Sequence, residues 1–300
     1  MDDNTLNQTN TTRPVKRRKK KSQLRAIWRR MLKNKIAMVG LVIFAIIFFC
    51  MVFANFIVPY EVALEQVIEE RLQPPSLQHW FGTDNFGRDI FARIIYGTRY
   101  SLSLGIIAVA VGLVIGGVFG SVAGYFGGII DGIIMRIMDT ILTMPSILLS
   151  LLIVAALGPG FTNVMIALSI AQIPYYARVV RSAILNIVGQ DFIEAGKACG
   201  TPNLQIIFRH VLPNAIGTII VQATMKVGVI IITAAALGFL GMGIQPPTPE
   251  WGGMLSEGKN YMMFMPWIVL VPGLAITITS LSLNLMGDGL RDALDPRLKD

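Results

Sequence analysis

The run IAMVGLVIFAIIFFCMVFANFI, residues 36–57, decides the fold class. It contains no charged side chain, and Pro59 follows it closely. A helix needs about 20 apolar residues to cross the ~30 Å hydrocarbon core of a bilayer, so this run predicts a membrane-spanning helix. The apolar core of a cleaved signal peptide is shorter, roughly 7 to 15 residues. We therefore interpret the run as a retained first span.

The rest of the chain repeats this pattern. Of the 300 residues, 53% are hydrophobic and only 15% are charged, which is typical of an integral membrane protein. Lipid offers the backbone no hydrogen-bond partner, so the spans should be helices, and continuous apolar runs exclude a barrel of alternating strands. The sequence predicts an all-α membrane protein with six transmembrane helices, the other five at about 102–122, 141–157, 164–177, 215–240 and 267–286.

Lys and Arg side chains set the expected orientation. They gather in the N-terminal tail and in alternate loops, which by the positive-inside rule puts both termini in the cytoplasm. The net charge of +8 is therefore a topology signal, and we expect no nucleic-acid partner. The predicted order is a basic tail at 1–35, a first span at 36–58, an extracellular segment at 59–98 and a five-helix core at 99–300. The core contains a cytoplasmic loop at 179–214 and an extracellular loop at 241–266.

Two local features bear on the helix ends. Apolar residues at helical spacing in 24–32 predict either an amphipathic helix at the lipid interface or an extension of the first span. Arg136 and Asp139 have the i,i+3 spacing of a helix ion pair at the predicted cytoplasmic entrance of the third span.

Polar residues interrupt the last two spans. Lys226 lies near the middle of the fifth span, where a charge costs about 2.5–3.5 kcal/mol. Such groups line a water-filled path or join helices by hydrogen bonds, and the sequence leaves both open. The candidate path residues are Gln222, Lys226, Thr233, Thr277, Ser280 and Asn284.

No motif predicts a cofactor, metal or catalytic site in this chain. The segment GMLSEGKN, 253–260, resembles a phosphate-binding loop, but Asn260 stands where a Ser or Thr would hold magnesium. Cys50 and Cys199 fit no metal-ligand spacing, and His79 and His210 fall on opposite sides of the predicted membrane.

The segment EAGKACGTPNLQIIFRHVLPN, 194–214, is polar between two apolar stretches. Its first part is helical in type and should end at Gly200, and a second short helix should follow and be closed by Pro213. Two short helices across the cytoplasmic face would form a docking element for a partner.

This segment resembles the EAA loop of ABC importer permeases. That family pattern is Glu-Ala-Ala, three residues, Gly, nine residues, Ile, one residue, Leu-Pro, and this chain matches it except at Gly196 and His210. The runs WRRMLKNKIAMVGL, FGTDNFGRDIFARIIYGTRYSL, GYFGGIIDGIIMRIMD, FLGMGIQPPTPEWGGML and GDGLRDALDPRL are similar to successive hallmarks of the dipeptide/oligopeptide permease C-type subunits.

The resemblance implies a type I ABC importer permease in a bacterial plasma membrane. It also implies a second homologous permease, two cytoplasmic ATPase subunits that bind ATP and magnesium, and an extracellular binding protein that delivers peptide. The chain itself would be no enzyme and would hold no cofactor. The implied coupling residues are Glu194, Ala195, Gly196, Gly200, Leu212 and Pro213.

Two alternatives stay open from the sequence. Importers of the same class carry nickel or other small solutes. A secondary transporter or channel would work without ATP, but it would need an ion-coupling acid inside a span, and the acids of this chain fall in loops.

Overall fold

The computed structural model describes residues 23–294, and this part of the chain is a bundle of helices with no β-strand. The predicted basic tail at 1–22 and the last residues, 295–300, lie outside the described residues. The helices are α1 Gln23–Lys33, α2 Lys35–Ile57, α3 Tyr60–Leu64, α4 Ile90–Phe126, α5 Gly128–Leu142, α6 Ser146–Leu157, α7 Phe161–Val188, α8 Asp191–Ala198, α9 Asn203–Ile206, α10 Leu212–Phe239, α11 Trp251–Gly258 and α12 Trp267–Leu294, with short 3₁₀ turns at Ile68–Glu70 and Lys259–Tyr261 and a π-helical turn at Ile207–Val211.

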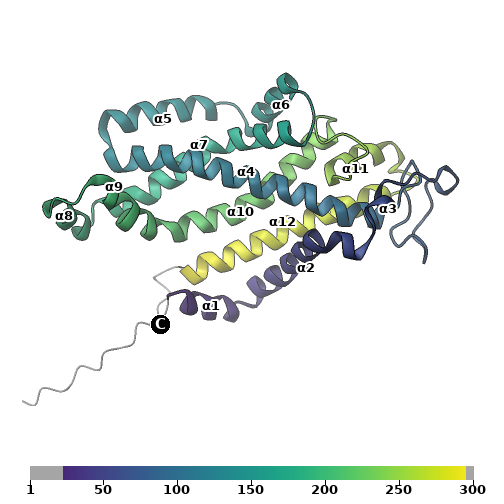
Figure 1. Ribbon diagram of the computed structural model, residues 1–300, viewed down its shortest axis with the longest axis horizontal. Coiled ribbons are helices and arrows are strands. Elements are labelled where there is room, and N and C mark those ends of the chain that lie inside the picture. Colours follow the sequence, from purple (N-terminus) through teal and green to yellow (C-terminus); the bar gives the residue numbers. More distant parts are fainter. Residues whose placement is uncertain (1–22, 295–300) are drawn as a thin grey trace, which may run out of the picture.

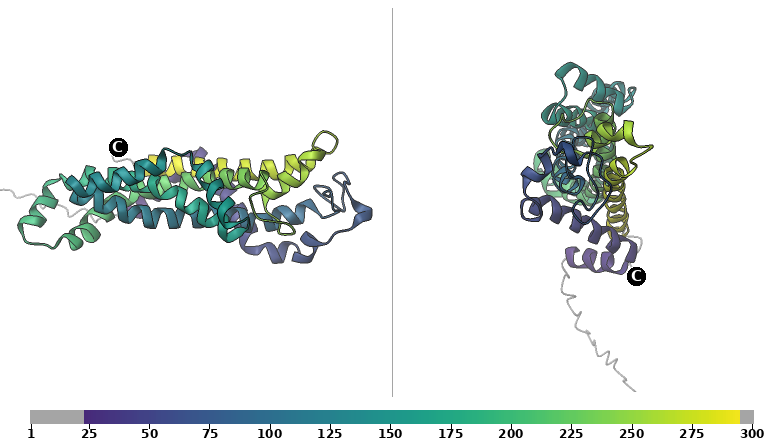
Figure 2. Two further views of the ribbon diagram at one scale, coloured as in Figure 1. Left: turned by 90° about the horizontal axis from the view of Figure 1, so that it is seen from above. Right: turned by 90° about the vertical axis from the view of Figure 1, so that its right-hand side faces the viewer.

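The long helices run side by side along the long axis of the molecule (Figure 1). Helices α8 and α9 lie at one end, and α3 and α11 lie at the other (Figures 1 and 2). Helix α1 and the last turn of α12 lie toward the α8–α9 end. The first and last described helices therefore reach the same side of the bundle as the segment with the EAA-like sequence.

Four helical segments in the described part are long and apolar enough to cross a membrane: α2, α4, the segment 203–239 that contains α10, and α12. Helices α5 and α6 together count as a fifth crossing, but they meet at a bend of 80°. The predicted third span, 141–157, contains this bend: its first two residues belong to α5, and residues 146–157 form α6. The bend lies just before Pro145, which lacks the N–H that would continue the helix.

Helix α7 contains the predicted fourth span, 164–177, but is longer, at 28 residues. It is absent from the segments that pass as spans by length and hydropathy. Its second half carries Arg178, Arg181 and several amides, and these side chains lower its hydropathy without ending the helix.

A row of glycines sets the closest helix–helix contact, between α4 and α7. Gly112, Gly116, Gly120 and Gly124 recur every four residues along α4. A Cβ at Gly116 would lie 2.4 Å from the carbonyl oxygen of Ile173, so the two backbones touch there. Small residues at this spacing let membrane helices pack closely where apolar burial gives no driving force.

Helix α1 is separate from the first span. Asn34 between them is extended, and its side chain accepts a hydrogen bond from the N–H of Ala37 and so caps α2. Arg30 donates to the carbonyl of Ala293 at 3.3 Å, and Met31 is buried. The structure thus excludes a continuous extension of the first span and packs α1 against the end of α12.

Buried charges fix the opposite end of the bundle. Arg88 pairs with Asp84 and with Glu257 of α11, both at 2.6 Å, and Arg93 reaches the same Glu257 oxygen at 3.2 Å. Both guanidinium groups are almost fully buried. Because removal of one partner from a buried pair leaves an uncompensated charge, this network ties the segment before α4 to α11.

Candidate coupling loop and polar cavity

Helix α8 presents the first residues of the EAA-like sequence to solvent. Glu194 and Ala195 are exposed and Gly196 is half-buried, whereas Ile193 is buried against the last turns of α7 and the start of α10. Asp191 and Glu194 lie in the first turn and Lys197 in the last, which suits the helix dipole. The helix is held by its one buried face and leaves the other face free.

The predicted end of this helix at Gly200 is confirmed. Gly200 has φ +74°, the N–H of Thr201 donates to the carbonyl of Gly196 at 3.1 Å, and the N–H of Gly200 donates to the carbonyl of Lys197. This left-handed residue after the last helical turn is the usual glycine stop. A Cβ there would meet no neighbour within 4 Å, so only backbone strain opposes a larger residue.

The predicted helix end at Pro213 is wrong. Leu212 and Pro213 lie in the first turn of α10, and the helix continues through them from Asn203. Pro213 cannot donate to the carbonyl four residues before it and would clash with it. The chain widens to a π-helical turn at Ile207–Val211, where the N–H of Leu212 donates to the carbonyl of Ile207, and the helix absorbs the proline.

The loop formed by α8, α9 and the π-helical turn carries exposed apolar side chains. Phe192 on α8, Leu204 on α9 and Phe208 on the π-helical turn are 44%, 68% and 68% exposed. They surround Gly200 in sequence and lie at the far end of the molecule from α11 (Figure 1). Side chains of this size in an otherwise polar loop are typical of the anchors of a protein interface.

The candidate path residues of α10 divide between two environments. Gln222 accepts a hydrogen bond from the hydroxyl of Tyr175 at 2.9 Å, and the Lys226 ammonium lies 4.0 Å from the centre of the Tyr175 ring. Thr233 instead donates to the carbonyl of Val229 in its own helix. Gln222 and Lys226 therefore face α7, and Thr233 adds nothing to that group.

The candidate residues of α12 do not join them. Ser280 is buried against Gly228, where a Cβ would lie 2.9 Å from its hydroxyl oxygen. Thr277 donates to the carbonyl of Gly273, and Asn284 is half-buried. Gly228 lies on the opposite side of α10 from Lys226, because two residues turn a helix by about 200°. The two polar rows do not line one common space.

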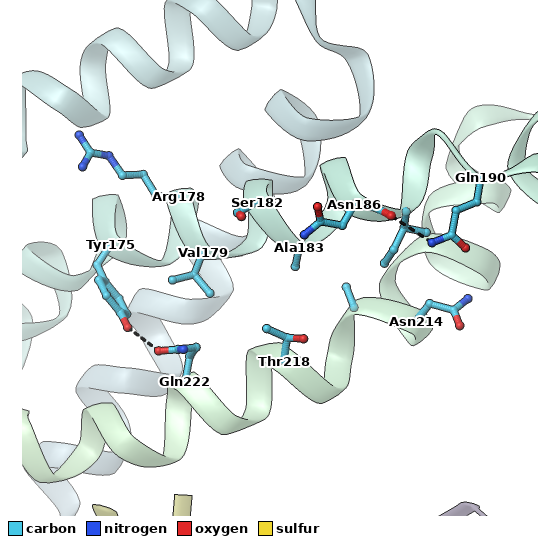
Figure 3. Close-up of a pocket in the computed structure, with 12 residues that line it drawn as sticks. Tyr175, Arg178, Val179, Ser182, Ala183, Asn186, Gln190, Asn214, Thr218 and Gln222 are labelled. Carbon is cyan, nitrogen blue, oxygen red and sulfur yellow. Dashed lines mark hydrogen bonds between the residues drawn. The ribbon is translucent and has the colours of Figure 1, made fainter. Parts of the chain in front are cut away.

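A polar cavity of about 670 Å³ lies between α7 and α10 (Figure 3). Tyr175 and Gln222 meet at one end, and Gln190 and Asn214 lie toward the other. Its polar lining recurs every four residues on both helices, the spacing of one helix face. The two rows are Arg178, Ser182 and Asn186 on α7, followed by Gln190 just after the end of that helix, and Asn214, Thr218 and Gln222 on α10.

Sequence reasoning missed this cavity although both rows are visible in the sequence. The α10 row, continued by one turn, is Asn214, Thr218, Gln222 and Lys226. The signal was the four-residue spacing in two segments that flank the polar loop. It was missed because the α7 row lies beyond the end predicted for the fourth span.

Ion pairs join α5 to α7 beside the cavity. Asp131 binds Arg181 through two contacts of 2.5 and 2.6 Å, and Asp139 binds Arg178 at 2.6 Å. The expected pair of Arg136 with Asp139 is therefore wrong. Two N–H groups of Arg178 donate to one oxygen of Asp139, at 3.2 and 2.6 Å, so the partner of this carboxylate comes from the neighbouring helix.

The comparisons with known proteins agree with this geometry. Residues 116–300 match the family described as "Binding-protein-dependent transport system inner membrane component", and residues 22–75 match "N-terminal TM domain of oligopeptide transport permease C". The chain belongs to this permease family. It is therefore an inner-membrane permease component of a binding-protein-dependent transport system and not an enzyme.

Curated relatives cover nearly the whole chain. The dipeptide transport system permease protein DppC of Alkalihalophilus pseudofirmus is 47% identical over 93% of this chain and 91% of its own length. The di/tripeptide transport system permease protein DppC of Pseudomonas aeruginosa is 43% identical over 93% and 94%. The glutathione transport system permease protein GsiD of Shigella flexneri is 46% identical over 91% and 90%.

A solved structure shares the fold. The inward-facing MetNI methionine ABC transporter contains a chain that matches with a TM-score of 0.56 and 20% identity, over 69% of this chain and 98% of that one. The all-helical permease fold expected from the sequence is thus confirmed in its coarse form.

Proposed function

We propose that this chain forms half of the membrane pathway of an ATP-driven importer for small peptides. It would cross the membrane six times, with α2, α4, the bent pair α5–α6, α7, α10 and α12 as the spans and both termini in the cytoplasm. The shared end of α1, α8 and α12 supports this orientation (Figure 1), as does the basic composition of the tail.

The exposed loop at α8 and α9 is the observation on which the coupling role rests. Two cytoplasmic ATPase subunits would bind ATP and magnesium, and one of them would hold the apolar side chains of Phe192, Leu204 and Phe208, which are exposed in this chain. Movement of that ATPase would pull on α7 and α10 directly, because α8 follows α7 without a long linker and the π-helical turn leads into α10. The residues that would set the docking geometry are Glu194, Ala195, Gly196, Gly200, Leu212 and Pro213.

A second homologous permease and an extracellular binding protein would complete the importer. Peptide cargo is supported by the relatives, whose names specify dipeptides, di- and tripeptides, and glutathione. Nickel or another small solute is the remaining alternative within this class. No group of three or more His, Cys, Asp or Glu side chains that could hold a metal occurs among residues 23–294, so no feature of the described chain favours that cargo.

Co-purification from membranes tests the coupling role. The tagged native chain should bring down a second permease and ATPase subunits. The double variant Glu194→Ala, Gly200→Pro should keep the second permease and lose the ATPases, because it changes the loop and leaves the spans intact. Identification of the co-purified chains by mass spectrometry reads out both.

Gly158 provides a matched control. It also has positive φ, +89°, and a Cβ added there would meet no atom within 4 Å, but it lies between α6 and α7, away from the loop. Gly158→Pro should retain the ATPases. If the native chain comes down alone and moves solute into vesicles without ATP, the proposed function is wrong.

A further inference from the structure

Lys226 is a charged group that the described chain does not neutralise. No Asp or Glu among residues 23–294 lies within salt-bridge distance of its ammonium; its one close polar neighbour is the face of the Tyr175 ring, at 4.0 Å. The nearby bases of α7 differ, because Arg178 and Arg181 are each paired with an aspartate of α5. A cation retained in a span at a cost of about 2.5–3.5 kcal/mol is expected to have a partner, and residues 23–294 do not supply it.

The geometry around Lys226 leaves hydrogen-bond donors free at the deep end of the cavity. The Tyr175 hydroxyl donates to the Gln222 carbonyl oxygen at 2.9 Å, which turns the amide so that its NH₂ group is not used by that bond (Figure 3). Lys226 follows Gln222 by one helical turn and so lies directly above it. Gln222 and Tyr175 line this end of the cavity, and Lys226 lies just beyond the lining, with its ammonium against the Tyr175 ring. No acidic residue lines the cavity.

The cavity connects this group to the coupling loop. Its lining on α7 runs from Tyr175 to Ile187, about 18 Å at 1.5 Å per residue. That depth suits an extended chain of a few residues, and the Asn, Gln, Ser and Thr lining suits peptide N–H and C=O groups.

We propose that Lys226 and Gln222 bind the free C-terminal carboxylate of a peptide inside the α7–α10 cavity, on its way to the cytoplasm. The site rests on the proposed function, and it assigns a polarity to the cargo: the carboxylate at the Tyr175 end and the rest of the peptide toward the loop. A peptide with a blocked, neutral C-terminus loses the charge-assisted contact. The ammonium at the other end of a peptide is repelled by Lys226 and cannot take the same place.

The test reaches the site from the cytoplasmic side, where the binding protein plays no part. The complete importer, with its second permease, ATPases and binding protein, is reconstituted in vesicles. ATP-driven uptake of labelled dialanine from the binding-protein side is measured while the ATPase side contains millimolar unlabelled dialanine or dialaninamide. With the native chain, dialanine should inhibit uptake about tenfold more strongly than the amide, the scale of one charge-assisted hydrogen bond.

The variants separate charge from packing. Uptake by Lys226→Gln should be inhibited equally by both probes, and Lys226→Arg should keep the preference for dialanine. Lys259→Gln is the matched control, since Lys259 also lies over an aromatic ring, that of Phe239 at 5.4 Å, but Phe239 ends α10 and does not line the cavity as Tyr175 does. It should behave as the native chain does.

Three results would overturn the proposal, each in a different way. If both probes inhibit uptake equally in the native chain and in Lys226→Gln, the proposed carboxylate site is wrong, but the proposed peptide import is not affected. Loss of the second permease on purification of Lys226→Gln would show that an acid of that subunit is the partner. A native importer that takes up no peptide would reject the proposed function itself.

Discussion

At the scale of the residue, Glu250 is the most unusual group outside the spans. It is fully buried at the start of α11, where its carboxylate accepts hydrogen bonds from the N–H groups of Gly252 and Gly253 at 2.9 and 2.7 Å and from the Ser101 hydroxyl at 3.1 Å. No Lys or Arg in residues 23–294 pairs with it. Burial raises the pKa of Glu250 above 4.5, and these three hydrogen bonds oppose part of the rise.

This raised pKa predicts a pH dependence of stability with a definite sign. The folded chain holds the Glu250 proton more tightly than the unfolded chain does, so stability is complete at low pH and is lost as pH rises from 4.5 through the folded pKa. Glu250→Gln keeps an acceptor for the same donors and removes the charge. Thermal unfolding in detergent should show a midpoint that falls as pH rises above 4.5 in the native chain, and falls less in the variant.

The exposed Glu65 supplies the comparison for that experiment. Glu65→Gln should follow the native profile, because this substitution removes no buried charge. Coincident profiles for the native chain and Glu250→Gln would mean that water or an unidentified cation reaches the carboxylate.

At the scale of the element, the glycine row of α4 determines where α7 lies. A Cβ at Gly120 would stand 2.3 Å from the carbonyl oxygen of Ala177, a backbone atom that cannot rotate away. Gly120→Ala should therefore separate the helices and destabilise the chain by about 1–3 kcal/mol, the usual cost of overpacking. The midpoint of thermal unfolding in detergent measures the loss.

Gly117 on the same helix allows a direct comparison. A Cβ added at this position would have one neighbour, the Val180 side chain at 3.9 Å, which is an ordinary contact. Gly117→Ala should be neutral or slightly stabilising, since alanine favours a helix over glycine by about 1 kcal/mol. Equal destabilisation by both substitutions would show that helix packing is not what the glycines provide.

The elements also show what the sequence could and could not predict. Apolar runs located α2, α4, α10 and α12, because a bilayer fixes the length of a crossing helix. The same criterion found only the apolar first part of α7, whose second part carries the polar side chains of a cavity, and it placed the third span across the break between α5 and α6 at Pro145. Pro213 was misread because its effect depends on whether the helix can widen into a π-helical turn, which neighbouring residues in sequence do not reveal.

Some features of the candidate site could also be predicted from the sequence, and others could not. Gly200 was predictable because a glycine stop is a local property of the backbone. The partners of Arg178 and Arg181 lie on another helix, at sequence separations of 39 and 50, so no local spacing indicates them. The polar rows of α7 and α10 are regular within each helix, but only the packing of the two helices makes them one cavity.

At the scale of the whole molecule, the orientation in the membrane can be read with one native residue. Cys199 is exposed beside Gly200 at the α8–α9 end, and Leu77 is 98% exposed in the segment before α4, toward the opposite end (Figure 1). If α8 docks an ATPase, Cys199 must lie in the cytoplasm and Leu77 outside. A membrane-impermeant maleimide should label the native Cys199 in inside-out vesicles only.

Leu77→Cys in a Cys50→Ala, Cys199→Ala background should label in right-side-out vesicles only, because the bundle between the two positions crosses the bilayer. The chain is expressed without its ATPases, so that a bound subunit does not shield Cys199. Labelling of Cys199 from outside would show that the molecule has the opposite orientation, with the α8–α9 loop on the side of the membrane where no ATP-binding partner is present. The coupling mechanism, the cytoplasmic opening of the α7–α10 cavity and the direction of peptide release would then all be wrong, since each depends on that one end facing inward.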